Sequence, residues 1–203
     1  MHALIATDLR KGYTSGKVRT EILRGLSLSI DSGKLTLISG PSGCGKSTLL
    51  SILSGLQRPD AGSVIALGED LWRGDKRALD RFRLAHTGFV FQGFNLFPAL
   101  TALEQVMLPL GYLAIDDAEA ARRSRIALEE VGLAARMQLR PAELSGGEKQ
   151  RVCVARAMMN DPEVIFADEP TASLDHANGH LVVDLLSAYK DRGTVIVVTH
   201  DPE

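Results

Sequence analysis

The chain has 203 residues, of which 45% are hydrophobic and 24% charged, and its formal net charge is -2. This length can bury one sizeable core, and the composition is ordinary for a globular protein. The small net charge gives no sign of a nucleic-acid surface, and no apolar run approaches the roughly 18 residues of a membrane span. The two cysteines have no metal or redox spacing and the start has no signal-peptide pattern, so we expect a cytoplasmic protein with no nucleic-acid partner.

The first third of the chain alternates short strand-like runs with Gly, Ser and Asp turns. The runs read HALIATDL, GLSLSI, KLTLIS and GSVIAL, between residues 2 and 67. Residues 45–56 then show the apolar spacing of a helix, which we expect to stop at Gly55. The stretch HTGFVFQGF at 86–94 predicts a buried strand that ends in a polar loop.

Helical patterns with charged outer faces dominate from Thr101 to about Asn160. Strands return in EVIFAD at 163–168 and GTVIVVT at 193–199, with a helix predicted between them. Such continuous apolar runs suit parallel strands that are covered on both faces. The sequence therefore predicts an α/β nucleotide-binding core interrupted by a helical insertion.

The stretch GPSGCGKST at 40–48 fits the phosphate-loop pattern G-x-x-x-x-G-K-[ST] and lies between a predicted strand and a predicted helix. Its glycines let backbone N–H groups approach phosphate oxygens at a helix N-terminus. Lys46 would reach the β- and γ-phosphates, Ser47 would ligate Mg²⁺, and Thr48 would assist. The alternative is a glycine turn that only caps a helix. The predicted phosphate-binding residues are Gly40, Pro41, Ser42, Gly43, Cys44, Gly45, Lys46, Ser47 and Thr48.

A carboxylate at the end of a neighbouring strand should complete the Mg²⁺ site. Asp168 follows the apolar run at 164–167 and would hold the metal. Glu169 is then placed to polarise the attacking water as general base. An Asp-Glu pair after a strand can also be a solvated turn, but beside a phosphate loop it predicts a nucleoside triphosphatase.

A second glycine pair stands in ELSGGEKQR at 143–151. Ser145 and Glu148 form a capping box, so this segment begins a helix. Gly146 and Gly147 are poor helix formers, at about 1 kcal/mol each against alanine, and they leave bare backbone amides that suit a γ-phosphate. The chain's own loop already surrounds its phosphates, so the phosphate in question would belong to another chain.

The stretch LSGGEKQR at 144–151 resembles the signature of the ATP-binding cassette (ABC) ATPases, and the resemblance extends over nearly the whole chain. In that family two nucleotide domains pack head to tail, and each signature closes over the ATP of the other. The resemblance implies a P-loop core with a parallel sheet, an N-terminal antiparallel β subdomain and a helical signature subdomain. It divides the single domain 1–203 into a core of 1–92 and 161–203 and a helical subdomain of about 93–160.

Further residues match the family's pattern in the expected order. Tyr13 would stack on adenine, unless it is an ordinary core or surface tyrosine. Gln92 resembles the loop glutamine that contacts Mg²⁺ and the water and senses the transporter partner. Asp175, in TASLD at 171–175, resembles the marker of the loop that crosses the dimer, and His200 resembles the switch histidine at the γ-phosphate.

The absence of an N-K-x-D sequence argues against a GTPase, and the absence of a long coiled-coil insertion argues against chromosome-organising relatives. The stretches at 18–30 and 89–110 are similar to ATPases of the lipoprotein-release, macrolide-export and cell-division type, which drive a membrane permease. We therefore expect an ATP-hydrolysing subunit that dimerises on MgATP and lies peripherally on the cytoplasmic face of the inner membrane. A soluble ABC ATPase of DNA repair or translation, or an envelope regulator that moves no cargo, is the alternative.

The permease is expected to dock against apolar side chains near Gln92. These side chains are Phe91, Phe94, Leu96, Phe97 and Leu100. The alternative is an ordinary core of the helical subdomain. The family usually continues with further strands and a helix beyond the residue that matches His200, so we expect the C-terminal end to be cut short.

Overall fold

The computed structural model describes residues 1–200, and the expected truncation at the C-terminal end lies outside the described residues. The strands are β1 (His2–Ser15), β2 (Val18–Asp31), β3 (Leu35–Ser39), β4 (Ala61–Ala66), β5 (Glu69–Asp70), β6 (Thr87–Val90), β7 (Val164–Asp168) and β8 (Thr194–Thr199). The α-helices are α1 (Lys46–Leu53), α2 (Lys76–His86), α3 (Ala102–Tyr112), α4 (Asp117–Glu130), α5 (Gly146–Met158) and α6 (His176–Tyr189). Two short 3₁₀ turns, Ala134–Arg136 and Pro141–Glu143, lie between α4 and α5.

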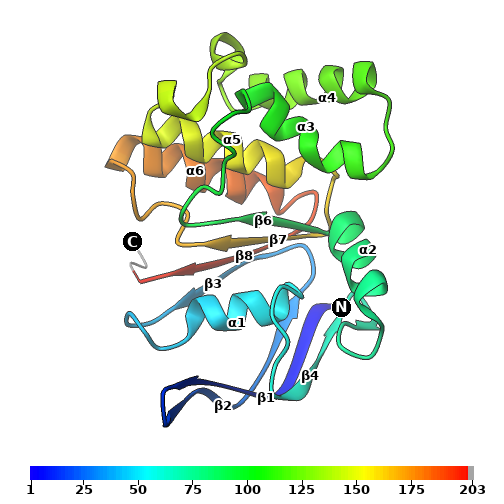
Figure 1. The fold of residues 1–203 in the computed structure, drawn as a ribbon, viewed down its shortest axis with the longest axis vertical. Coiled ribbons are helices and arrows are strands. Elements are labelled where there is room, and N and C mark those ends of the chain that lie inside the picture. The colour runs from blue at the N-terminus through cyan, green and yellow to red at the C-terminus, as the bar shows by residue number, and fades with distance from the viewer. Residues whose placement is uncertain (201–203) are drawn as a thin grey trace.

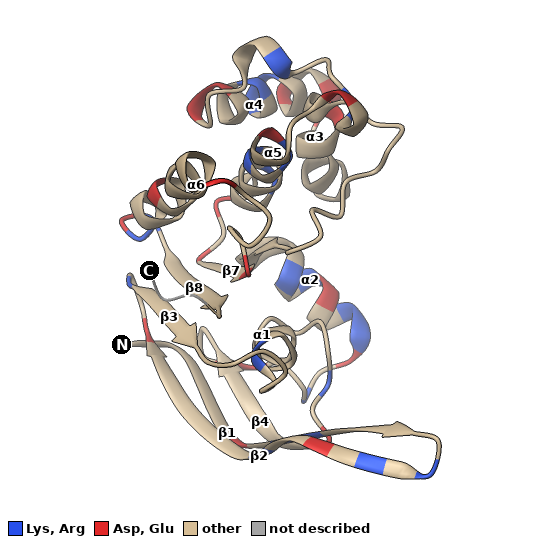
Figure 2. Ribbon diagram, turned by 90° about the vertical axis from the view of Figure 1, so that its left-hand side faces the viewer, with Lys and Arg blue, Asp and Glu red and all other residues tan. Residues whose placement is uncertain are grey.

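The N-terminal strands form an antiparallel sheet in the order β2-β1-β4-β5. β1 and β2 are joined by a tight turn and pair along their whole length, from His2 opposite Asp31 to Ser15 opposite Val18. Their far end extends away from the rest of the molecule (Figure 2). The sequence predicted only the first half of β1, because its second half, from Arg10 to Ser15, contains hardly any apolar residues.

The second sheet is parallel, with the order β3-β8-β7-β6. β7 and β8 are its central strands, and all of their residues except Asp168 are buried. α1 covers one face of this sheet, while α5 and α6 cover the other (Figure 1). The prediction of parallel strands covered on both faces is confirmed.

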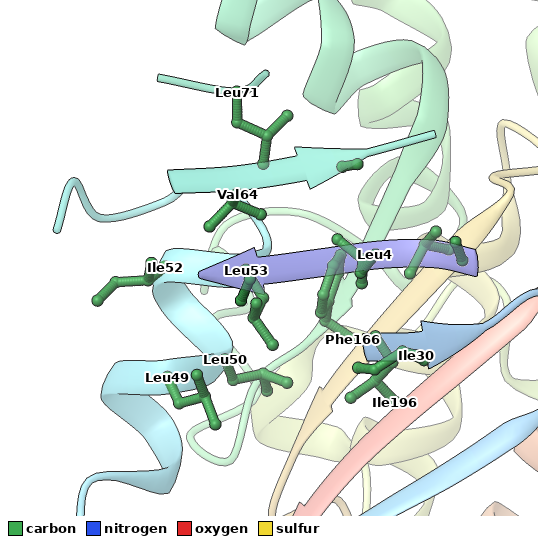
Figure 3. Close-up of a cluster of buried hydrophobic side chains, with 14 of the residues drawn as sticks. Leu4, Ile30, Leu49, Leu50, Ile52, Leu53, Val64, Leu71, Phe166 and Ile196 are labelled. Atoms are coloured by element: carbon green, nitrogen blue, oxygen red, sulfur yellow. The ribbon is translucent and has the colours of Figure 1, made fainter. Parts of the chain in front are cut away.

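α1 is packed between the two sheets and so fixes where the loop before it lies. Leu50, Ile52 and Leu53 are fully buried and pack with Leu4 of β1 and Phe166 of β7 (Figure 3). The helix ends at Leu53 with Ser54 as its C-cap, and Gly55 follows with a φ of 75°, the left-handed conformation typical after a helix C-terminus. The stop predicted at Gly55 is confirmed.

The helices α3, α4 and α5 pack together above the parallel sheet and share a buried apolar cluster (Figure 1). Thr101 begins α3 with a capping box to Glu104. Buried Gln105 is bonded to the backbone of the loop before α3, donating to Phe97 O at 2.6 Å. These contacts tie the segment after β6 to the helical part.

The bounds of one helix, α2, were not predicted from the sequence. Only Phe82 of this helix is buried, so its apolar stripe is too sparse to read as a periodic pattern. Asp75 caps its start by accepting a hydrogen bond from Ala78 N at 2.7 Å. Within residues 1–200, none of the helices is long and apolar enough to cross a membrane.

Candidate functional site

The glycine-rich loop joins the end of β3 to the start of α1. Gly43 and Gly45 have φ values of 78° and 100°, a region that residues with a Cβ rarely adopt. Gly45 precedes α1, and no side chain caps that helix start. A Cβ at Gly45 would also lie 2.5 Å from Ile22. The loop therefore presents uncapped backbone amides at a helix N-terminus, an arrangement that attracts phosphate.

Lys46 is folded back over this loop. Its Nζ donates to Gly40 O at 2.7 Å and to Pro41 O at 3.1 Å, and its side chain is only 8% exposed. The backbone carbonyls thus hold the ammonium group inside the curve of the loop, where a phosphate would bind. A lysine held in this way acts as a positive point charge toward phosphate oxygens.

Ser47 and Asp168 come from different elements and meet directly. Ser47 Oγ donates to Asp168 Oδ1 at 2.9 Å. Burial raises the pKa of Asp168, and Glu169 acts in the same direction, while the bond from Ser47 and the charge of Lys46 oppose the rise. A hydroxyl and a carboxylate oxygen at this spacing are ligands of the kind that Mg²⁺ prefers, so these residues fit the expected metal.

Glu169 follows Asp168, and its carboxylate lies near the side chains of His200 and Lys46. Its Oε2 lies 2.7 Å from Nδ1 of His200, and its Oε1 lies 3.9 Å from Nζ of Lys46. Glu169 has a φ of 47°, an unusual value for a residue with a side chain, and its side chain is only 11% exposed. Its backbone N–H donates to Val198 O at 2.9 Å, which ties this conformation to β8.

Tyr13 of β1 lies beside the phosphate-loop helix. Its hydroxyl donates to Gln57 Oε1 at 2.9 Å and lies 3.4 Å from Thr48 Oγ1, so the hydroxyl of Thr48 faces the tyrosine. The residue remains 44% exposed, and Lys11 Nζ lies 5.9 Å from the ring centroid. This aromatic ring is therefore accessible to a planar group near the loop.

Gln92 is exposed in the loop after β6. Because Val90 is opposite Ala167 in the parallel sheet, the glutamine and Asp168 lie beyond the same edge of neighbouring strands. The structure gives no hydrogen bond between Gln92 and the other candidate residues in the described part of the chain. The strand ends thus bring Gln92 to the same edge of the sheet as Asp168, but they do not fix the position of its side chain.

The segment containing the second glycine pair begins α5. Ser145 Oγ accepts from Glu148 N at 3.2 Å, and Ser145 N donates back to Glu148 Oε2 at 2.8 Å, so the predicted capping box is present. Arg136 donates to the same glutamate at 2.9 Å. A Cβ on Gly146 would meet nothing closer than 3.7 Å, so close packing does not require a glycine at this position.

Gly147 lies against Asn178, which the sequence did not single out. A Cβ on Gly147 would overlap with the Asn178 side chain, including its Cβ at 2.8 Å. Arg151 Nη1 donates to Asn178 Oδ1 at 2.8 Å, and Asn178 Nδ2 donates to Asp175 Oδ2 at 2.8 Å. Asn178 therefore joins the glycine pair to Asp175, a link that only the three-dimensional contact could reveal.

Asp175 caps the start of α6 by accepting from Asn178 N at 2.9 Å. The backbone and side-chain hydrogen bonds from Asn178 hold the pKa of Asp175 below its ordinary value. This carboxylate therefore stays ionised at neutral pH. It fixes the loop that precedes α6 relative to α5.

Apart from Gln92, the candidate residues fall into two groups. One group, around the phosphate loop, Asp168 and Glu169, is joined by hydrogen bonds and by the close approach of Lys46 to Glu169. The other group, Ser145 to Gly147 with Asp175, is joined through Asn178. α1 and α5 cover opposite faces of the parallel sheet (Figure 1). Among the described residues, no hydrogen bond or ion pair connects the two groups.

The fold and the first group of residues define a nucleoside-triphosphatase of the phosphate-loop class. The model of the ABC transporter family matches residues 23–172. The chain belongs to this family and is one of its ATP-binding, ATP-hydrolysing cassettes, so the predicted α/β fold, the nucleotide and the enzyme class are confirmed.

Relatives and a solved structure agree with this assignment. The chain is 46% identical to the lipoprotein-releasing system ATP-binding protein LolD of Geobacter metallireducens, over 96% of this chain and 87% of that protein. It is 43% identical to the macrolide export ATP-binding/permease protein MacB of Shigella flexneri, over 97% of this chain but 30% of MacB. A dimeric post-hydrolysis state of the ATP-binding cassette MJ0796, bound to ADP and Pi, has a TM-score of 0.92 and 39% identity, over 98% of this chain and 88% of that chain.

Proposed function

We propose that this chain hydrolyses ATP at a seam between two copies of itself and thereby drives a membrane permease. The observation that carries this proposal is the separation of the candidate residues into two groups that no described hydrogen bond or ion pair joins. One copy would supply the phosphate loop, and the other would supply the helix start at Ser145. The dimeric solved relative bound to ADP and Pi supports this arrangement.

Each residue has a defined part in the proposed reaction. The loop amides and Lys46 bind the phosphates, and the oxygens of Ser47, Asp168 and Gln92 would hold Mg²⁺, which supplies charge neutralisation when bound. Glu169 accepts the proton of a water as that water attacks the γ-phosphorus in line. His200 orients the carboxylate of Glu169 through the 2.7 Å contact and would approach the γ-phosphate.

The second copy would complete the site with Ser145, Gly146 and Gly147. Their helix start carries bare amides and a hydroxyl, which stabilise negative charge on the γ-phosphate. Tyr13 would stack on adenine, and Asp175 would face the partner across the seam. ADP and phosphate leave when the dimer opens.

A complementation experiment tests the shared site. Lys46→Ala removes the phosphate-binding lysine from a chain's own loop. Ser145→Arg blocks the helix start that the chain would place against the nucleotide of its partner. A mixed dimer of the two variants retains one intact site, made from the loop of the Ser145 variant and the helix start of the Lys46 variant. ATPase activity should therefore return on mixing.

The matched control mixes Lys46→Ala with a chain that carries both substitutions, and this mixture contains no intact site. Each variant should be nearly inactive alone. If mixing the two single variants restores no activity while both chains remain folded and still dimerise, the two-chain site is wrong.

The permease would dock in a groove of about 730 Å³ between α2, β6 and α3. Phe91 and Phe97 line it, whereas Phe94 and Leu96 of the expected docking residues pack into the buried clusters instead. Further apolar and aromatic lining residues are Leu56, Phe89, Leu108, Pro109 and Tyr112. In MacB, the cassette and a permease belong to one protein. An amphipathic helix from the cytoplasmic side of such a permease would fit an aromatic groove of this kind.

Two exposed aromatic side chains of the groove allow a test that leaves the core intact. Phe97 is 57% and Tyr112 79% exposed, so Phe97→Asp and Tyr112→Asp should fold normally. Each should abolish co-purification of a polytopic membrane protein from detergent-solubilised membranes. Val183→Asp, at a 47% exposed position on α6, is the control. Equal recovery of the membrane protein with all three variants would exclude this groove as the docking site.

The proposal also includes a division of the chain and a location. Residues 1–92 and 161–203 would form the core, and about 93–160 the helical subdomain, which the separate buried cluster of α3, α4 and α5 supports. Through its permease the chain would lie on the cytoplasmic face of the inner membrane.

A further inference from the structure

Two histidines on α6 lie against each other, and neither has a part in the proposed nucleotide chemistry. His176 and His180 are one helical turn apart, and their side chains meet on the same row of the helix. Their Nε2 atoms are 3.3 Å apart, and their ring centroids are 4.2 Å apart with an interplanar angle of 70°. Both residues are exposed, so the pair is accessible to ions from solution.

The spacing of the two nitrogens equals that of two ligands on one tetrahedral ion. Nitrogens at ~2.0 Å from Zn²⁺ with a tetrahedral angle between them are about 3.3 Å apart. Rotation of the rings about their side-chain bonds would direct both lone pairs to a common point. Without an ion, one Nε2 donates a hydrogen bond to the other; on binding, that ring carries its proton on Nδ1 instead.

The surroundings of the pair favour a cation. Asp184 lies one further turn along the same helix row, and the ionised Asp175 immediately precedes the helix. The three other histidines differ, because each already contacts a carboxylate. These contacts are His2 with Asp31 at 2.9 Å, His86 with Glu163 at 3.1 Å and His200 with Glu169 at 2.7 Å.

We propose that His176 and His180 form a binding site for a divalent transition-metal ion, of which Zn²⁺ is the type. Imidazole nitrogens suit Zn²⁺, Ni²⁺ and Cu²⁺, whereas Mg²⁺ prefers oxygen, so the site is chemically distinct from the one at Ser47. No group of three or more His, Cys, Asp or Glu side chains gathers to hold a metal within the described residues. The remaining coordination positions are therefore filled by water or by a donor from another molecule.

An ion held here would bridge successive turns at the start of α6. The helix begins directly after Asp175, so the metal would stiffen the turn that anchors this residue. Binding to the folded state alone raises thermal stability by mass action.

Calorimetric titration with Zn²⁺ tests the proposal, using protein without an affinity tag and with excess Mg²⁺ in the buffer. All proteins carry His200→Ala, which removes the competing pair formed with Glu169. In this background, His176→Ala and His180→Ala should each weaken Zn²⁺ binding at least about 10-fold, since loss of even an outer-shell partner of a metal costs that much. The matched control His86→Ala should change the affinity less than twofold.

Thermal melting in the presence of a chelator checks that the variants fold, which we expect because both rings are exposed. Zn²⁺ should raise the melting temperature of the background protein, and this shift should be lost in both α6 variants. The site is refuted if millimolar Zn²⁺ shows no saturable binding. It is equally refuted if the binding survives either α6 substitution.

Discussion

Gly146 and Gly147 are neighbours in the first turn of α5, but only at Gly147 would an added Cβ overlap with another side chain. We predict that Gly147→Ala destabilises the protein and that Gly146→Ala does not. The new Cβ at position 147 would overlap with the side chain of Asn178, whose own Cβ is only 2.8 Å away. At position 146 the nearest atom is 3.7 Å away, an ordinary contact.

The size of the effect follows from the contacts. Overpacking of this kind costs about 1–3 kcal/mol. Displacing Asn178 also removes its bond from Arg151, worth about 1.5–3 kcal/mol as a bond to a charged group, unless water replaces part of it. Against this, alanine stabilises a helix by about 1 kcal/mol relative to glycine. A net loss of about 2 kcal/mol lowers the melting temperature by about 4–8 °C in a chain of this size.

Differential scanning calorimetry of four proteins isolates the contact. Asn178→Gly deletes the atoms that the new methyl group would meet, so Gly147→Ala should cost little in that background. The two substitutions should therefore be coupled by at least about 1 kcal/mol in a double-mutant cycle. Simple additivity, or a Gly147→Ala melting temperature equal to that of the wild type, would refute the reasoning.

Three further predictions concern the nucleotide site. Glu169→Gln should bind ATP, accumulate as a stable dimer in sedimentation and hydrolyse almost nothing; retained turnover would show that another group is the base. A maleimide should react with the exposed Cys44 in the phosphate loop and so slow ATP hydrolysis. The other cysteine, Cys153, should not react, because burial raises the pKa of its thiol to about 12. A Cys44→Ser variant whose ATPase activity is equally sensitive to the reagent would contradict this. Burial also raises the pKa of Asp168, so ionisation of this carboxyl lowers the stability of the folded protein as the pH rises above the ordinary pKa of 3.8. Without nucleotide or Mg²⁺, Asp168→Asn should therefore unfold at a higher urea concentration than the wild type at pH 7. This difference in urea midpoint should vanish toward pH 4.

The parts of the fold that could be predicted from sequence are those whose signals are local. The phosphate loop is contiguous, and its glycines, lysine and hydroxyl can be read together. The apolar runs of β7 and β8 predicted buried parallel strands, and the rule that such strands end at one edge placed Asp168 near Ser47. The capping box at Ser145 and Glu148 was equally visible, because a helix start is a local pattern.

Other features depend on contacts between distant segments. Asn178 is one polar residue in a helix, and nothing in its neighbourhood in sequence indicates that it fills the space beside Gly147. The division of the apolar stretch after Gln92 was also hidden: Phe94 and Leu96 pack inward, whereas Phe97 faces the groove. The left-handed conformations of Phe94 and Asn95 turn the chain there; asparagine is common in this conformation, but a phenylalanine does not signal it.

The hydroxyl of Ser145 can act at the same time as a hydrogen-bond acceptor and as a hydrogen-bond donor. Its oxygen accepts the bond from Glu148 N that starts the helix, and its hydrogen remains free to point at a nucleotide held by another subunit. Aspartate would start the helix equally well but would meet that nucleotide with a negative charge and no proton to offer. In the proposed two-chain site, Ser145→Asp would therefore abolish ATP hydrolysis while the fold and its stability stay unchanged.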